Sequence, residues 1–110
     1  MKRVMWIENK QGDLAGPARI GWVEVKNRGK KLVYGHQTFL SLRGRGFKSN
    51  FYDVANHDRY WISGCRKDGR DALYGTTVEI DEDALEEYWV RIRRCPEQVG
   101  VRKLRARSKY

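Results

Sequence analysis

The sequence predicts a small α+β domain, either a strongly bent antiparallel sheet or an SH3-like barrel of six or seven short strands, with one C-terminal helix. Three observations lead to this prediction. Short aromatic and β-branched segments alternate with turn-forming residues through the first 80 positions. One segment, from residue 81 to about residue 94, has apolar side chains at helical spacing. The 110 residues are enough for one core and fit one domain.

Two strands are predicted near the N-terminus. Residues 3–8 alternate, with Val4 and Trp6 on one side and Met5 and Ile7 on the other, and end at turn-forming residues. Apolar side chains on both sides indicate a central or well-covered strand. Residues 18–26 form the second predicted strand, in which a glycine at position 21 indicates a bulge or bend, as small barrels need at their corners.

A hairpin and a further strand follow. Residues 27–30 read Asn-Arg-Gly-Lys, and Gly29 can adopt the positive φ that a tight turn requires. Residues 31–34 are the short returning strand. Residues 37–42 alternate again, with Thr38, Leu40 and Leu42 on one side. The run Arg-Gly-Arg-Gly at 43–46 is a predicted loop whose glycines allow a close backbone approach.

The densest aromatic and basic region predicts a β-hairpin with arms at 49–54 and 59–64. Asn56, His57 and Asp58 provide the turn between the arms. Alternation leaves two choices: either Tyr60 and Ile62 face the core and Trp61 faces outward, or the reverse. The Asp-Gly pair at 68–69 is a strong turn signal, so residues 65–67 can pair with 70–73. Residues 77–80 form a brief extended segment.

One helix is predicted, because Leu85, Tyr88, Trp89 and Ile92 share a helix face. Its N-terminal cap is Asp81, or alternatively Asp83 with a glutamate three residues later. Cys-Pro at 95–96 ends the helix. Residues 98–110 contain few apolar side chains, so we expect a basic, loosely held tail after a single domain at 1–97.

Net charge is +9 and is unevenly distributed along the chain. Residues 1–77 hold 15 Lys/Arg against 7 Asp/Glu, residues 78–97 hold 3 against 7, and residues 98–110 hold 5 against none. A basic sheet and tail beside an acidic helix indicate a polyanionic partner. No apolar run is long enough for a membrane helix and no signal sequence begins the chain, so we expect a cytoplasmic protein without a membrane partner.

The predicted function is binding of RNA or DNA with low sequence specificity. Lys and Arg neutralise phosphates, and an exposed aromatic ring stacks on unpaired bases. We assign the stacking role to Trp61 and the remaining roles to basic residues of the sheet face and the tail. The predicted nucleic-acid-binding residues are Arg43, Arg45, Lys48, Arg59, Trp61, Arg66, Lys67, Arg70, Arg102, Lys103, Arg105 and Arg107.

The sequence also leaves other functions open. SH3-like barrels present aromatic grooves, so a protein-binding or regulatory module is the alternative. A small toxin-like ribonuclease would use His36 or His57 as a general base. Residues 43–46 could form a phosphate-holding nest, although no P-loop lysine follows. Cys65 and Cys95 lack the short spacings of zinc sites and are expected to be ordinary thiols. We expect no cofactor and assign no catalytic or metal-binding residue.

Several segments together resemble a family of short, uncharacterised bacterial proteins. They are the runs at 16–21 (Gly-Pro-Ala-Arg-Ile-Gly), 39–42 (Phe-Leu-Ser-Leu), 46–50 (Gly-Phe-Lys-Ser-Asn), 60–65 (Tyr-Trp-Ile-Ser-Gly-Cys) and 87–89 (Glu-Tyr-Trp). Members of that family often carry the label deoxyxylulose-phosphate synthase. The chain has no Gly-Asp-Gly motif for thiamine diphosphate, so the label is not adopted. Over residues 3–97, the resemblance implies a bacterial source and a shared fold, and no catalytic residue.

Overall fold

The computed structural model describes residues 1–12, 16–46, 48–72 and 74–106. Within these residues, eight strands form one sheet and four short helical segments connect or follow them. The strands are β1 (Lys2–Asn9), β2 (Ala18–Lys26), β3 (Lys31–Tyr34), β4 (Gln37–Ser41), β5 (Phe51–Asp53), β6 (Arg59–Gly64), β7 (Thr76–Ile80) and β8 (Lys103–Ala106). The helical segments are η1 (Asn27–Gly29), η2 (Glu82–Ala84), η3 (Glu87–Ile92) and η4 (Pro96–Gln98).

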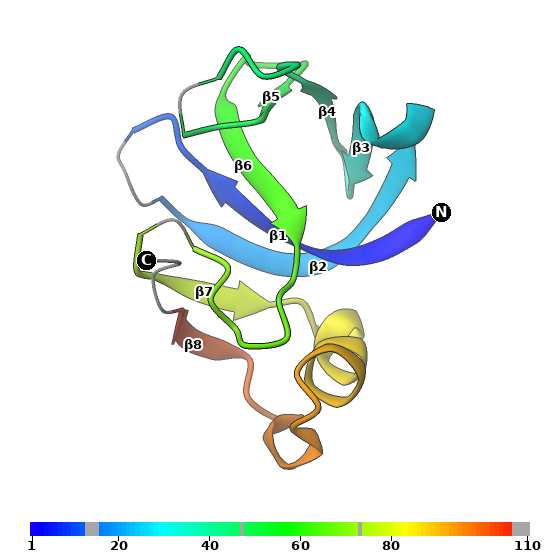
Figure 1. Ribbon diagram of the computed structural model, residues 1–110, viewed down its shortest axis with the longest axis vertical. Coiled ribbons are helices and arrows are strands. Elements are labelled where there is room, and N and C mark those ends of the chain that lie inside the picture. The colour runs from blue at the N-terminus through cyan, green and yellow to red at the C-terminus, as the bar shows by residue number, and fades with distance from the viewer. Residues whose placement is uncertain (13–15, 47, 73, 107–110) are drawn as a thin grey trace.

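Strands β1 to β6 form a closed antiparallel barrel (Figure 1). Their order is β1-β6-β5-β4-β3-β2, and β1 also pairs with β2, which closes the barrel. Closure leaves no unpaired edge among these six strands. The sequence predicted either a strongly bent sheet or a barrel, and the structure has a closed barrel. The described sheet has eight strands rather than six or seven, because β7 and β8 extend it from β2 outside the barrel.

Two hydrophobic cores lie on opposite sides of β1 and β2. The inner core fills the barrel and includes Met5, Ile7 and Val23. The outer core includes Trp6 and Ile20, and it lies between the barrel, β7, β8 and the helical segments. The alternation predicted for residues 3–8 is confirmed, because the two faces of β1 bury their side chains in different cores. Strand β1 thus contributes side chains to both cores.

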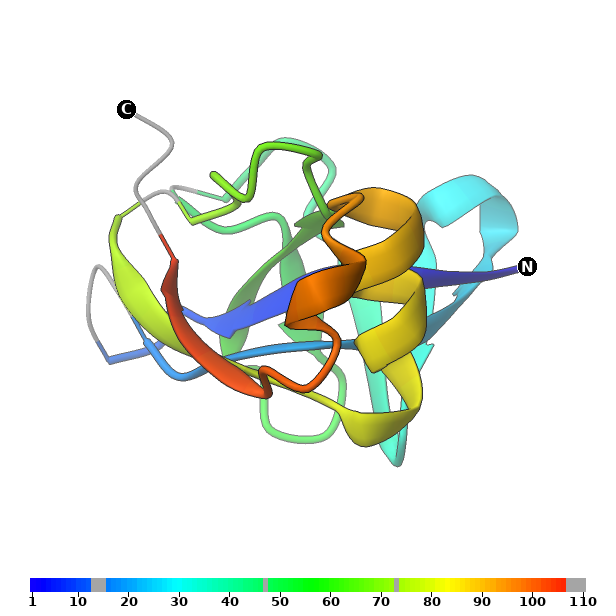
Figure 2. The same cartoon turned by 90° about the horizontal axis from the view of Figure 1, so that it is seen from below.

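Strands β7 and β8 form a small extension beneath the barrel (Figures 1 and 2). Strand β7 runs parallel to β2, with Ala18 opposite Val78, and β8 runs antiparallel to β7. The segment from 98 onward was expected to be a loosely held tail, and the structure differs over 103–106. Ala106 is buried and Leu104 packs on the outer core, so backbone pairing and two apolar side chains anchor this end of the described chain.

The predicted helix is present over a shorter range, as the 3-10 turn η2 followed by the π-helical segment η3. Its predicted apolar face is confirmed: Leu85, Tyr88 and Trp89 are buried in the outer core, and Ile92 packs against it. The predicted side-chain cap by Asp81 is wrong, because Asp81 makes no capping hydrogen bond. Its carboxylate instead faces the barrel.

Asp81 links the start of the helical segment to strands β2 and β3. Arg19 Nε donates to Asp81 Oδ1 at 2.9 Å, and Tyr34 Oη donates to Asp81 Oδ2 at 2.5 Å. A Cβ at Gly21 would collide with Asp81 and with the Tyr34 ring. Glycine occupies position 21 because the carboxylate and the ring approach the backbone of β2 closely. Burial, with the Asp81 bond, raises the pKa of Tyr34 to about 12.

The connection between β6 and β7 contains the predicted turn without the predicted strand pair. Gly69 has φ of +75° and its N–H donates to the Arg66 carbonyl at 3.2 Å, as a tight turn requires. Residues 65–71 adopt no strand conformation, and Leu73 lies outside the described residues. The Asp71 carboxylate accepts the Arg66 N–H at 2.6 Å, so a side chain takes the place of one ladder bond here.

No helix in the described ranges is long and apolar enough to cross a membrane.

Candidate nucleic-acid interface

The strand register places a row of side chains across the outer face of the barrel. Lys26 pairs with Lys31, Lys31 with Leu40, Leu40 with Tyr52, and Tyr52 with Arg59. Residues paired in this way point to the same face of a sheet. Five consecutive strands, β2 to β6, therefore present cations at both ends of the row and an aromatic ring between them.

A groove of about 600 Å³ follows part of this row, and we call it the barrel groove. It lies over β4, β5 and the start of β6, and the loops after β2 and β4 form its rim. Four of its lining residues are cations and none is acidic. The lining residues are Asn27, Lys30, Leu40, Ser41, Leu42, Arg43, Arg45, Tyr52 and Arg59.

The cations of the barrel groove are not neutralised by the described part of the protein. Lys30, Arg43, Arg45 and Arg59 form no ion pair among the described residues. All four are exposed. Unpaired like charges around one concavity raise the local positive potential, and that potential attracts anions.

The loop after β4 positions two of these arginines. Arg43 and Gly44 both have positive φ, at 54° and 80°. The Arg43 N–H donates to Ser41 Oγ at 3.0 Å, and the Arg45 N–H donates to the Leu42 carbonyl at 3.1 Å. Because these amides are already bonded within the loop, they do not form the phosphate-holding nest considered from the sequence. The two side chains are exposed and line the groove.

An aromatic pair borders the barrel groove. The Tyr52 and His57 rings are stacked, with centroids 6.1 Å apart and planes 13° from parallel. His57 occupies the turn between β5 and β6 with φ of 65°, and it is exposed. A ring on a sheet face beside arginines provides the surface on which an unpaired base stacks. In the structure Tyr52, and not Trp61, lines the groove.

Trp61 lies on the other side of β6 from Tyr60 and Ile62. Of the two choices left open by the sequence, the inward position of Tyr60 and Ile62 is confirmed, but Trp61 packs against a second core instead of facing outward. Tyr60 and Ile62 belong to the inner core, and Trp61 packs against the outer core. Phe39 and Tyr60 make an edge-to-face contact inside the barrel, at 4.7 Å between centroids. The ring assigned to stacking is thus half-buried under the barrel, away from the groove.

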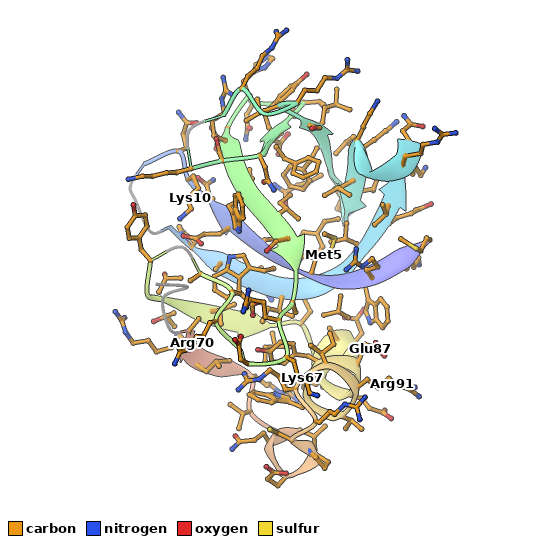
Figure 3. All side chains as sticks on the ribbon, viewed as in Figure 1. Met5, Lys10, Lys67, Arg70, Glu87 and Arg91 are labelled. Carbon is orange, nitrogen blue, oxygen red and sulfur yellow. The ribbon has the colours of Figure 1, made fainter. Side chains whose placement is uncertain are left out.

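The predicted binding residues do not form one surface. Arg43, Arg45 and Arg59 line the barrel groove. The connection from β6 to β7 carries the next group, and Figure 3 shows Lys67 and Arg70 beside β8 and the helical segments, far from β3, β4 and β5. Lys48 lies with its Nζ 4.9 Å from the centroid of the Tyr74 ring. Arg66, Lys67 and Arg70 are exposed.

Arg66 and Arg102 are neutralised by carboxylates within the described part of the chain. Arg66 forms two bonds of 3.1 Å with the Asp68 carboxylate, and Arg102 Nη2 lies 2.9 Å from Glu82 Oε1. Lys103 and Arg105 are exposed on β8. Arg107 lies outside the described residues. Register and loop geometry therefore select three of the twelve predicted residues for the groove.

A second group of titratable side chains lies in and beneath the β6–β7 connection. Burial raises the pKa of the Cys65 thiol above its ordinary value, raises that of Asp71 to about 6, and raises that of Tyr88 to about 12. Arg93 Nη1 donates to Tyr88 Oη at 3.1 Å. A thiol whose pKa is raised stays protonated near neutral pH, so Cys65 is a poor nucleophile.

Across residues 1–12, 16–46, 48–72 and 74–106, no group of three or more His, Cys, Asp or Glu side chains is placed to hold a metal ion. Cys65 and Cys95 are free of disulfide bonds and half-buried. His57 is the histidine that stacks on a residue of the barrel groove.

Comparisons with protein-family models, with curated proteins and with solved structures gave no match to this chain. The family resemblance noted from the sequence, with its bacterial source, therefore stays a prediction.

Of the charged and aromatic residues that line the groove, sequence reasoning missed two, Lys30 and Tyr52. Lys30 was interpreted only as part of a hairpin turn. Tyr52 was one of several aromatic residues in the basic region, with nothing to favour it over Trp61. The signal that would have found Tyr52 is the cross-strand row itself, because Leu40, Tyr52 and Arg59 share a face once the hairpin register is fixed.

Proposed function

We propose that the protein binds nucleic acid, RNA or DNA, with low sequence specificity through the barrel groove. The observation that carries the proposal is the lining of that groove, which combines four unpaired cations with one aromatic ring and contains no carboxylate. Lys and Arg side chains bind phosphates without reading sequence, and a stacked base on an aromatic ring is equally tolerant of sequence.

The shape of the lining favours a single strand. The cations lie at the two rims, with Lys30 and Arg43 near the turns and Arg59 on β6, while Tyr52 lies between them on β5. A single strand can place its phosphates along the rim and turn a base onto the ring, whereas the bases of a duplex are already stacked. Single-stranded RNA or DNA is therefore the expected ligand.

We further infer that the barrel is SH3-like. The short strands, the tight turns and the closure of a strongly bent sheet support this assignment. Grooves of such barrels also bind proteins, so a protein-binding module is the alternative function. The groove has two leucines and one tyrosine against four cations, a lining that favours an anionic ligand over an apolar peptide.

The test is a titration of fluorescent single-stranded and double-stranded RNA and DNA at several salt concentrations. The variant Arg43→Gln/Arg45→Gln/Arg59→Gln removes three groove cations. The matched control Arg66→Gln/Lys67→Gln/Arg102→Gln removes three exposed cations elsewhere, so both variants have the same net charge.

We expect single strands to bind the wild type at low salt and the groove variant to bind at least about tenfold more weakly. The slope of log K against log salt should fall by about 2 in the groove variant, since each phosphate contact on a single strand contributes about 0.7. The control variant should retain most of the wild-type affinity and most of the wild-type salt slope. Absence of binding at low salt, or equal losses in the two variants, would refute the proposal, and cleavage of the probe would replace it with a nuclease.

A further inference from the structure

We propose that the protein has a second anion site, which binds a phosphate monoester group between the β6–β7 connection and β8. This arginine pocket has a volume of about 450 Å³. Arg70, Arg93 and Arg105 contribute its positive charge. It is separate from the barrel groove and shares no lining residue with it.

Three arginines from three parts of the chain line this pocket. Arg70 follows the turn at Gly69, Arg93 follows η3, and Arg105 lies on β8. None of the three forms an ion pair within the described ranges. Like charges gathered in one concavity repel one another, and a bound anion removes that repulsion.

Arg93 is held in place before any ligand binds. Its guanidinium carbon lies 5.3 Å from the centroid of the Trp89 ring and 5.9 Å from that of Tyr88, and Nη1 donates to Tyr88 Oη. A Cβ at Gly69 would collide with the Arg93 guanidinium, so glycine at this position lets the charged group lie against the turn. A preorganised guanidinium loses little conformational entropy on binding an anion.

Arg105 is placed by the pairing of β8 with β7. Its Cα partner on β7 is Thr77, and a Cβ at Gly75 would be 3.4 Å from Arg105 Nη2, in ordinary contact. Two glycines thus lie against two of the three guanidinium groups. The third, Arg70, has its backbone N–H fixed by Asp68 Oδ1 at 3.0 Å.

The charge of the arginine pocket suits a dianion. Asp68 is its one acidic lining residue, and Arg66 already binds that carboxylate through two bonds. Three cations and one carboxylate leave a net charge of +2 on the lining. A phosphate monoester carries about −1.5 to −2 at neutral pH, and its three oxygens match the planar forks of guanidinium groups.

The test uses the full chain and isothermal titration calorimetry with inorganic phosphate and with glycerol phosphate. Arg105→Gln removes one guanidinium of the pocket. Lys103→Gln is the matched control, because it removes one exposed charge two residues earlier on the same strand and face. A second variant, Arg70→Gln, removes the guanidinium that the β6–β7 connection contributes to the pocket. Because Arg70 is exposed, this substitution leaves the hydrophobic core unchanged.

We expect phosphate to bind the wild type, and to bind Arg105→Gln and Arg70→Gln at least about tenfold more weakly, a loss of about 1.4 kcal/mol. Lys103→Gln and the groove variant Arg43→Gln/Arg45→Gln/Arg59→Gln should bind phosphate as the wild type does. Lack of phosphate binding up to about 10 mM, or equal binding by wild type and Arg105→Gln, would overturn the proposal.

A single-stranded oligonucleotide with a 5′-phosphate, compared with its 5′-hydroxyl form, distinguishes the two sources of the group. If the 5′-phosphate improves binding by the wild type and not by Arg105→Gln, the ligand is the end of a nucleic acid. If the two oligonucleotides bind alike while glycerol phosphate binds in the pocket, the ligand is a small phosphate ester. Since phosphate is titrated alone, failure of the barrel-groove proposal does not affect this result.

Discussion

Lys10 Nζ lies 2.7 Å from Glu8 Oε2, and only 3 % and 0 % of the two side chains are exposed. The Glu8 carboxylate also accepts the Trp6 indole N–H at 3.1 Å and the Gly16 backbone N–H at 3.0 Å. The pair lies at the end of β1, where the chain leaves the barrel, and its geometry compensates for the burial of two charges.

Replacing Lys10 with Met should destabilise the protein by about 3–5 kcal/mol, because Glu8 would remain as an uncompensated buried charge. The free energy of unfolding, measured by urea denaturation, checks this. Glu24 and Lys26 form a matched pair with the same spacing on β2, but they are 3.7 Å apart and roughly half exposed. Lys26→Met should cost less than about 1 kcal/mol. Similar costs for the two substitutions would contradict the prediction.

The second prediction concerns strand β8. Leu104 packs on the outer core and Lys103, its neighbour, points to solvent. Leu104→Ala should lower the free energy of unfolding by about 2 kcal/mol, since it removes methyl groups that pack on the outer core, whereas Lys103→Ala should change it by less than about 0.5 kcal/mol. Urea denaturation of the two variants separates an anchored strand from a loosely held tail. Equal and small effects would favour the tail.

The sequence predicts the strands well because apolar side chains that alternate along the sequence also point to alternate faces of the strands in the barrel. Val4 and Trp6 separate from Met5 and Ile7 as expected, and each pair is buried in its own core, as the apolar residues on both sides of the strand predict. Strand β8 was missed, because its two apolar residues become a strand only through pairing with β7 and contact with the outer core. Such tertiary stabilisation leaves no local pattern in the sequence.

The candidate site was predictable only in part for the same reason. Clustering of charge along the chain identified Arg43, Arg45 and Arg59. Arg43 and Arg59 approach one groove through the pairing of β4, β5 and β6, whereas Lys67, only eight residues further on, lies near the helical segments, far from that groove (Figure 3). Proximity in sequence does not predict a shared surface once a strand crosses the barrel. Barrel closure, which sequence alone does not fix, determines which cations share a surface.

The third prediction is a pH dependence that arises from Asp71. Burial raises its pKa from 3.8 to about 6, although the Arg66 N–H and the charge of Arg93 act in the opposite direction. Because the folded state holds this proton more tightly than the unfolded chain, the stabilising contribution is complete below about pH 4 and is lost as pH rises through 6. A shift of two units corresponds to about 3 kcal/mol.

Asp71→Asn should therefore gain stability relative to the wild type between about pH 4 and pH 7.5, by up to about 3 kcal/mol. Unfolding free energies measured across this range check the prediction. Asp68→Asn is the control, because the pKa of the exposed Asp68 is lowered to about 2 by Arg66 and its contribution is constant above about pH 5. Parallel pH profiles for Asp71→Asn and the wild type would show that Asp71 is not destabilised by burial.

The last prediction concerns the aromatic ring of the barrel groove. If Tyr52 stacks on an unpaired base, Tyr52→Ala should weaken the binding of single strands by about 1–3 kcal/mol, while Tyr52→Trp should restore it. The salt dependence should not change, because no phosphate contact is removed. Tyr74→Ala, which removes a ring that contacts Lys48 away from the groove, is the control. A loss of salt dependence in Tyr52→Ala, or equal losses in the two alanine variants, would show that the ring supports the fold rather than the ligand.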